Sequence, residues 1–364
     1  MDRLRNCVLS VFALTAIIAG LCTVSAIPAA QAAPKSRLTV ANSARNLAAS
    51  DFSGSPVAVS ATSSTNAWAV GNQCRSSACD AIAALILRWN GMAWSKVHTP
   101  NPSASLDSLS AVSATSSTNA WAVGWYCPTT ACAVQHTLIL HWNGSTWSRV
   151  KSPNPNSAGT NNLNGVNATS AGRAWAVGQY CVSGCNSMAA VQRTLVLRWN
   201  GTVWSKVASP NPSAAGNFLD AVRAPSSTSA WAVGEYCSGP CGGSMHTLIL
   251  RWNGTRWSRV KAPNPTAGGS GNYLYGVSVT SPANAWAVGY NCMSECHTVT
   301  LHWNGTAWSR VASPNPDATS GGGLLFGVSA ISATNAWAAG WSCEQCAAQH
   351  AVLLHWNGKA WSQS

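Results

Sequence analysis

Charged side chains are scarce in this sequence, and acidic ones are the scarcest: 9 Asp and Glu stand against 21 Lys and Arg in 364 residues. A glycoside hydrolase needs two carboxyl groups on either side of one bond, so this shortage disfavours such an enzyme. The acidic residues that recur near equivalent cysteine pairs are Glu235, Glu295 and Glu344. A glycan hydrolase built on these three is kept as the weakest of three hypotheses.

Other signals of an enzyme or a helical protein are also missing. The sequence contains no G-x-S-x-G, H-E-x-x-H or phosphate-binding glycine loop, and its repeated part shows no 3.6-residue hydrophobic period. Lys and Arg are spread thinly rather than gathered in one patch, which disfavours specific nucleic-acid binding. We therefore expect an all-β, non-enzymatic protein without a cofactor or metal.

The first 32 residues have the features of a leader. Arg3 and Arg5 precede an apolar run from residue 7 to 22, and Ala30 and Ala32 form the small-x-small pattern of a signal-peptidase site. We predict a signal peptide at 1–32 and a secreted protein. The alternative is an uncleaved anchor, because residues 7–27 are long enough to span a bilayer.

What the sequence has in abundance is tryptophan, 20 residues, in a repeated pattern. The tryptophan of the "AWAVG" phrase recurs every 51 to 56 residues, at positions 68, 121, 175, 231, 286 and 337. A period of this length indicates a circular or stacked array. After an N-terminal segment at 33–54, six repeats are predicted at 55–107, 108–161, 162–217, 218–272, 273–323 and 324–364.

Each repeat contains four short strand signals, which residues 274–311 illustrate. "LYGVSV", "AWAVGY", "HTVTLHW" and "TAWSRV" are apolar segments separated by turn residues. Asn304-Gly305 predicts a hairpin with a two-residue type I′ turn, in which both residues take positive φ. Four antiparallel strands in each of six repeats predict a monomeric six-bladed β-propeller, and "LTV" at 38–40 is a candidate closing strand.

Twelve of the 14 cysteines form six close pairs, one in each repeat. In an exported chain such pairs indicate disulfide bonds, whereas zinc needs four ligands at one point. The predicted disulfides, which we call clips, are Cys74–Cys79, Cys127–Cys132, Cys181–Cys185, Cys237–Cys241, Cys292–Cys296 and Cys343–Cys346.

The order L-x-x-V-S-x, A-W-A-V-G, L-x-L-[HR]-W-N-G-x-x-W-S-[KR]-V over residues 55–364 resembles the repeats of tectonin-type propeller lectins and, more distantly, kelch repeats. The hairpin "WNGTAW" is similar to a W-D-G-x-G-W hairpin of six-bladed fucose-binding lectins. This chain has a single glycine where kelch repeats have a pair, and it adds the cysteine clips. The resemblance implies a propeller and, less directly, sugar binding.

Strand direction places the clips and the "SPNP" crossovers at one end of the propeller, the clip face, and the Asn-Gly turns at the other, the turn face. Sequence varies more between repeats at the clip face, so we expect ligand binding there. An aromatic ring beside an imidazole suits a sugar; packing of these rings beneath the clips is the alternative. The candidate residues are Trp125, Tyr126, Tyr180, Tyr236, Tyr290, Trp341, His136, His246, His297 and His350, with Arg193 in place of histidine in the third repeat.

Two further regularities have structural explanations. A basic residue follows each hairpin tryptophan except the last, at Lys96, Arg149, Lys206, Arg259 and Arg310; it protects a blade edge or, alternatively, forms an anion-binding ring. N-G-[ST] occurs at Asn143, Asn200, Asn253 and Asn304, which fits N-glycosylation as well as a turn.

The sequence therefore predicts an exported module that binds a polysaccharide, a glycan or a cell-surface polymer at its clip face. An extracellular protein-interaction scaffold is the second hypothesis.

Overall fold

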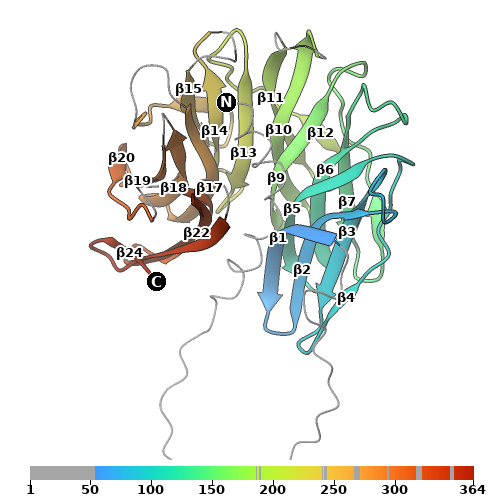
Figure 1. The fold of residues 1–364 in the computed structure, drawn as a ribbon, viewed down its shortest axis with the longest axis horizontal. Helices are drawn as coiled ribbons and strands as arrows, with labels where there is room; N and C mark the ends of the chain where they lie inside the picture. Colours follow the sequence, from blue (N-terminus) through green and yellow to red (C-terminus); the bar gives the residue numbers. More distant parts are fainter. Residues whose placement is uncertain are drawn as a thin grey trace, which may run out of the picture.

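The computed structural model describes residues 54–364 except 186, 188–189, 240, 242–243, 266–270, 293–294, 317–321 and 345–347. In these residues the chain is all-β, with six four-stranded antiparallel sheets, each made from four strands that are consecutive in sequence. Figure 1 shows these sheets as blades arranged around a common centre, from blue (blade one) to red (blade six). The predicted six-bladed β-propeller is confirmed. The predicted leader and the "LTV" segment lie outside the described residues.

The strands of blades one to three are short and regularly spaced. They are β1 (Gly54–Ser63), β2 (Asn66–Cys74), β3 (Ile82–Trp89), β4 (Trp94–Lys96), β5 (Asp107–Ser116), β6 (Asn119–Tyr126), β7 (His136–Trp142), β8 (Trp147–Arg149), β9 (Asn161–Ser170), β10 (Arg173–Ser183), β11 (Val191–Trp199) and β12 (Trp204–Lys206).

Blades four to six repeat the same order. Their strands are β13 (Asn217–Arg223), β14 (Ala230–Cys237), β15 (Met245–Trp252), β16 (Trp257–Val260), β17 (Gly271–Ser281), β18 (Asn284–Cys292), β19 (Cys296–Trp303), β20 (Trp308–Val311), β21 (Gly323–Ser332), β22 (Asn335–Glu344), β23 (Ala348–Trp356) and β24 (Trp361–Gln363).

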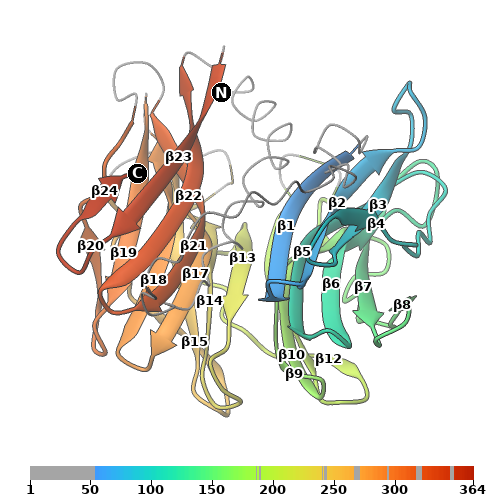
Figure 2. The same cartoon turned by 90° about the horizontal axis from the view of Figure 1, so that it is seen from below.

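The first strand of every blade is the innermost one. β1, β5, β9, β13, β17 and β21 contact one another in that order, and Figure 2 shows them near the centre, with the fourth strands outside. Side-chain oxygens join neighbouring inner strands, as where Ser60 Oγ accepts a hydrogen bond from the Ala114 amide (3.0 Å) and Ser113 Oγ from that of Ala168 (3.0 Å). The inner strands therefore set the spacing of the blades.

A tryptophan seam joins each blade to the next. The Trp286 ring on β18 lies 4.9 Å from that of Trp356 and 5.0 Å, edge-on, from that of Trp361 in the following blade. Trp68, Trp121, Trp175 and Trp231 make the equivalent contacts. All five rings are at most 4% exposed, and a tryptophan buries about 150–250 Å². The seams therefore contribute a large apolar area to each core cluster, together with Leu, Ile, Val and Ala side chains.

A polar residue covers each seam tryptophan from its own blade. The His141 ring stacks on Trp121 with centroids 4.2 Å apart, and the Arg251 guanidinium lies 5.2 Å from the Trp231 centroid. Burial lowers the pKa of His141 and of His302, which favours the neutral imidazole in this contact. The [HR]-W pairs of the sequence are thus parts of the seam.

The seam is not repeated between blades six and one in the described part of the chain. Trp337 is only partly buried and stacks on His355 of its own blade. Trp89 and Trp94, which would complete a sixth seam, are also partly exposed and pair with each other at 5.7 Å. Among the described residues β21 packs on β17 and β1 packs on β5, and no comparable contact joins β21 to β1. The described part of the ring is therefore open at this position.

The Asn-Gly hairpin differs from the expected type I′ turn. Trp142 pairs with Trp147, which leaves a four-residue loop, and within it only Gly144 has positive φ (103°). Asn143 instead accepts hydrogen bonds through Oδ1 from the amides of Ser145 (3.0 Å) and Thr146 (2.9 Å). These two hydrogen bonds to the asparagine side chain stabilise the loop, so a second residue with positive φ is not needed.

The asparagine of the "SPNP" crossover completes the edge of the third strand. Asn154 Oδ1 accepts a hydrogen bond from the Thr137 amide (2.7 Å), and Asn211 does the same for Thr194 (2.7 Å). The fourth strand has three or four residues, too few to cover the whole third strand. The repeated phrase therefore encodes blade structure from the turn to the crossover.

We predict that Trp286→Ala will lower the free energy of unfolding by about 3–5 kcal/mol, the usual cost of removing a buried tryptophan. Trp337→Ala is the matched control, because the same residue at the open end lacks a partner in blade one and should cost about half as much or less. Guanidinium unfolding followed by circular dichroism measures both. Equal losses would show that blades one and six contact each other in solution.

Candidate functional site

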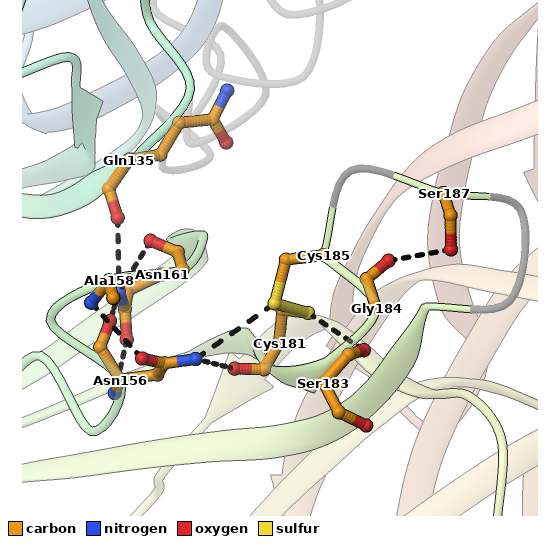
Figure 3. The surroundings of a disulfide bond; sticks show 10 residues. Gln135, Asn156, Ala158, Asn161, Cys181, Ser183, Gly184, Cys185 and Ser187 are labelled. Atoms are coloured by element: carbon orange, nitrogen blue, oxygen red, sulfur yellow. Dashed lines mark hydrogen bonds between the residues drawn. A yellow bond between two sulfur atoms is a disulfide. The ribbon is translucent and has the colours of Figure 1, made fainter.

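The clips and crossovers lie together, as strand direction requires. Figure 3 shows the Cys181–Cys185 clip of blade three beside the crossover from blade two, where Asn156 Nδ2 donates to the Cys181 carbonyl (2.9 Å). Asn161, at the start of β9 and fully buried, donates through Nδ2 to the Gln135 and Asn156 carbonyls (3.0 and 2.7 Å). In blade three these bonds hold the crossover against the clip.

Five of the six predicted disulfides are present: Cys74–Cys79, Cys127–Cys132, Cys181–Cys185, Cys237–Cys241 and Cys292–Cys296. They indicate an oxidising environment. The sixth, Cys343–Cys346, lies outside the described residues. In the described ranges no three His, Cys, Asp or Glu side chains are placed to hold a metal ion, and no helix is long and apolar enough to cross a membrane.

The six aromatic candidates do not share one surface. Trp125, Tyr290 and Trp341 directly follow the glycine of the "AWAVG" phrase or its equivalent, whereas Tyr126 and its counterparts Tyr180 and Tyr236 stand one residue later. Neighbouring residues of a strand point to opposite faces of the sheet. The candidates therefore form two sets. Tyr290 and Trp341 of the first set contact inner strands, where both pack against Phe326, and the second set lies beside the fourth strand of its own blade.

In blades two to four the second set forms tyrosine–cation units. Lys206 Nζ donates to the Tyr180 hydroxyl (3.0 Å) and lies 4.3 Å from the ring centroid. Arg259 donates to the Tyr236 hydroxyl at 2.7 Å. Arg149 likewise donates to Tyr126. The basic residues of the fourth strand are exposed and each is held by a phenol, a partnership that the sequence analysis missed.

The candidate imidazoles join two of these units. His136 Nδ1 lies 3.4 Å from the Tyr126 hydroxyl, and the His246 ring stacks on Tyr236 with centroids 5.2 Å apart. Arg193, opposite Tyr180, donates instead to the Ser213 and Ala214 carbonyls. The structure thus brings aromatic, imidazole and cation together in blades two and four, and aromatic and cation in blade three.

Blades one, five and six lack the tyrosine at this position. His297 is opposite Asn291 and lies 2.8 Å from Asn315 Nδ2, so it does not pair with Tyr290 as expected. In blade six a shallow hollow of about 350 Å³ is lined by Pro316, Ser342, His350, Ala351 and Gln363.

Blade one has an equivalent hollow of about 390 Å³, lined by Gln73, Lys96 and the segment 97–101 without Pro100. Gln73 and Ser342 occupy the position at which Tyr126 stands in blade two. In blades two to four a tyrosine occupies this position. In blades one and six another residue stands there, and a hollow lies beside it.

The acidic residues that lie together are Asp220 and Glu235, rather than the predicted set of Glu235, Glu295 and Glu344. Glu235 is 8% exposed and faces Asp220 on the preceding strand, while Glu295 is exposed beside its clip. The Glu344 side chain lies outside the described residues. Asp220 was missed because it is 15 positions away in sequence, across a β-hairpin whose register shifts at that residue.

Burial strongly perturbs this carboxyl pair. Loss of solvation raises the pKa of Asp220 to about 7, despite hydrogen bonds with Glu235 and Asn164. Loss of solvation and the negative charge of Asp220 raise the pKa of Glu235 well above its usual value. With both groups ionised, Asp220 Oδ2 and Glu235 Oε2 have no hydrogen-bond donor among the described residues, so we infer that the pair shares a proton near neutral pH.

The glycosylation sequons lie in the hairpin turns. Asn143, Asn200, Asn253 and Asn304 each use Oδ1 to accept bonds from the turn. The turns alone therefore explain the Asn-Gly-[ST] sequence, while glycosylation at these residues stays a prediction.

No family model matches the sequence. No curated protein sequence matches it either. The resemblance to tectonin-type and kelch repeats therefore rests on the framework residues alone.

Solved structures with a similar fold do exist. An ulvan lyase of polysaccharide lyase family PL25 bound to -[GlcA(1-4)Rha3S]- has a TM-score of 0.53 at 11% identity, over 88% of this chain and 83% of that chain. YCF48 bound to a D1 peptide has a TM-score of 0.50 at 15% identity, over 85% and 81%. A fucose-specific lectin from Aleuria aurantia has a TM-score of 0.46 at 11% identity, over 84% and 94%. At such low identity these similarities concern the fold alone.

We predict that the carboxyl pair makes stability depend on pH. Because the folded pKa values exceed those of the unfolded chain, the pair costs nothing below about pH 4 and destabilises the fold progressively as pH rises toward about 7. Between about pH 4.5 and 8 the wild type should lose about 1–3 kcal/mol more than Asp220→Asn, which cannot ionise. Denaturant midpoints at several pH values measure this, with exposed Glu295→Gln as the control. Parallel curves for wild type and Asp220→Asn would contradict the shared-proton arrangement.

Proposed function

We propose that this protein is an exported, non-enzymatic module that binds a carbohydrate or cell-envelope polymer through its clip face. The observation that carries the proposal is the tyrosine–cation unit, repeated at equivalent positions in blades two, three and four. Residues 1–32 act as the export signal in this proposal, and residues 55–364 form the binding domain.

The chemistry of the unit suits a sugar. A pyranose presents C–H groups that stack on an aromatic ring and hydroxyl or carboxylate oxygens that accept hydrogen bonds. Arg149, Lys206 and Arg259 are exposed and already oriented by a phenol. Little side-chain entropy is then lost when an oxygen ligand replaces water.

Repetition around the propeller favours a polymer over a single sugar. The three tyrosine–cation units and the hollows of blades one and six occupy the same place in five blades. Weak sites on one rigid body add through avidity when one chain reaches several of them. The clips close the surrounding loops, and in blade three Asn156 also bonds to the clip, which keeps the sites in a fixed arrangement.

The fold is compatible with sugar and protein ligands alike, because similar propellers bind the -[GlcA(1-4)Rha3S]- repeat in ulvan lyase and a peptide in YCF48. Docking of a protein on the clip face is therefore the outcome to distinguish. The positive net charge of +12 adds a general attraction to anionic polymers, which the experiment must separate from specific binding.

We predict that the triple variant Tyr126→Ala, Tyr180→Ala, Tyr236→Ala binds cell-wall and glycan polymers at least about tenfold more weakly than the wild type, since three sites lose their stacking surface. The measurement is a polymer array read at physiological salt and at about 0.5 M NaCl, where general charge attraction is screened.

Two charge variants provide the matched comparison. Arg149→Gln, Lys206→Gln, Arg259→Gln removes the cations of the units, and Arg173→Gln, Arg256→Gln, Lys359→Gln removes three exposed cations from the turn face. Only the first should weaken binding. Equal losses, or binding that disappears in high salt for the wild type, would leave only charge attraction; no polymer binding at all would favour a protein ligand.

A further inference from the structure

The inner strands carry a second set of variable residues, one at a β-bulge in each blade. In every inner strand the register shifts opposite the glycine of the "AWAVG" phrase or its equivalent. A Cβ atom at Gly234 or Gly289 would overlap the carbonyl oxygen of Phe218 or Tyr273. Such a bulge changes the direction of one side chain. The bulge residues are Val57, Ser110, Asn164, Asp220, Tyr275 and Phe326.

From blade three to blade six these residues form a row on adjacent inner strands. Asn164 Nδ2 lies 3.2 Å from Asp220 Oδ1 of the next blade, and the Tyr275 ring lies 5.2 Å from that of Phe326. The charges of Glu235 and Asp220 act on Tyr275, whose pKa is raised well above its usual value, first of all by burial. The row therefore passes from amide to carboxyl to phenol to phenyl.

A second row, the residues directly after the glycines, supports the first. Gln179 Oε1 accepts from Asn164 Nδ2 (2.9 Å), and the Tyr275 and Tyr290 hydroxyls lie 3.5 Å apart. Trp341 stacks on Phe326 with centroids 6.2 Å apart. Three residues of this second row are almost completely buried: Glu235, Tyr290 and Trp341 are 8%, 7% and 5% exposed.

The bulge residues keep part of their surface accessible. Asp220, Tyr275 and Phe326 are each partly exposed, in contrast to their supports. Glu235, more than nine-tenths buried, also has an oxygen, Oε2, without a hydrogen-bond donor. The unpartnered oxygens of Asp220 and Glu235 lie just beneath the accessible rings of Tyr275 and Phe326 and the exposed part of Asp220. A ligand hydroxyl that enters between these side chains would satisfy them.

Charge restricts the ligand class. Two carboxyl groups without a cationic partner among the described residues repel an anion, and the net charge of +12 disfavours the approach of a polycation. Their shared proton is held between the two carboxyl groups, so the pair offers acceptor oxygens to a ligand, and the Tyr275 phenol offers a donor. Together these groups match adjacent hydroxyl groups. We propose that the bulge row of blades three to six is a single binding site for one uncharged pyranose residue.

The inference shares only the sugar class with the proposed function and concerns a separate site. The clip-face units present cations and so suit acidic as well as neutral sugars, whereas the bulge row, which contains no cation, excludes acidic ones. Binding of a neutral sugar without binding of its uronic acid counterpart would therefore indicate the bulge row, whereas binding of both would indicate the clip face.

The test uses the full chain with its disulfides formed and titrates it with neutral methyl pyranosides and the matching methyl uronosides, followed by saturation-transfer NMR. We expect at least one neutral pyranoside to bind the wild type, and to bind at least about tenfold more weakly to Asp220→Asn and to Tyr275→Phe, which keep the side-chain volume but alter the hydrogen-bond donors. Ser110→Ala, at the equivalent bulge of blade two, should bind as the wild type does.

Several outcomes overturn the inference. It is wrong if no neutral pyranoside binds, if the Asp220 and Tyr275 variants bind normally, or if the uronosides bind equally well at the row. The clip-face variant Arg149→Gln, Lys206→Gln, Arg259→Gln should leave this binding intact. Loss of polymer binding in that variant with pyranoside binding retained would support both sites, and either one can fail without the other.

Discussion

The fold depends on the contact between one tryptophan and a pair of tryptophans in the next blade. A blade of four strands, the last only three or four residues long, has little interior of its own and must bury its faces against neighbours. The five seams supply that burial, and their central tryptophans are at most 4% exposed. Because Asn-Gly turns and "SPNP" crossovers position the paired tryptophans, the whole repeated phrase is constrained by this one contact. The same constraint explains why the phrase varies so little while the clip loops differ.

A second constraint acts at the inner strand and leaves room for variation. The glycine after "AWAV" approaches a neighbouring carbonyl too closely for any side chain, and the bulge on the opposite strand follows from that approach. The bulged side chain lies at the junction of two blades, where neither the seam nor the sheet dictates its chemistry. Valine, serine, asparagine, aspartate, tyrosine and phenylalanine occupy this position in turn. Such diversity at a geometrically fixed point is typical of a surface selected for contacts rather than for packing.

Much of the architecture could be predicted from sequence, since the repeat period, the strand alternation and the cysteine pairs are local signals. The sequence also singled out Tyr126 and its counterparts as candidate ligand-binding residues, which stays a prediction. Their pairing with the fourth-strand cations was not predicted, because it depends on register across two strands. The pairing of Asp220 with Glu235 also depends on register. The two residues are far apart along the chain, and only the bulge at Asp220 places it against Glu235. The Asn-Gly turn was assigned to the wrong class because Asn143 satisfies the loop by its side chain, which leaves only one residue with positive φ.

The open end affects how the two candidate sites should behave. Blades one and six lack the sixth seam in the described residues, so they contact one neighbour each, as terminal repeats of an open array do. The bulge row lies on blades three to six, and three of its four supports belong to blades joined on both sides. The hollows of blades one and six, by contrast, lie in the end blades, where local opening costs least. A ligand that bridges these hollows would have to hold blades one and six in fixed positions, and part of its binding free energy would be used for that. A ligand at the bulge row meets a surface that the seams between blades already fix.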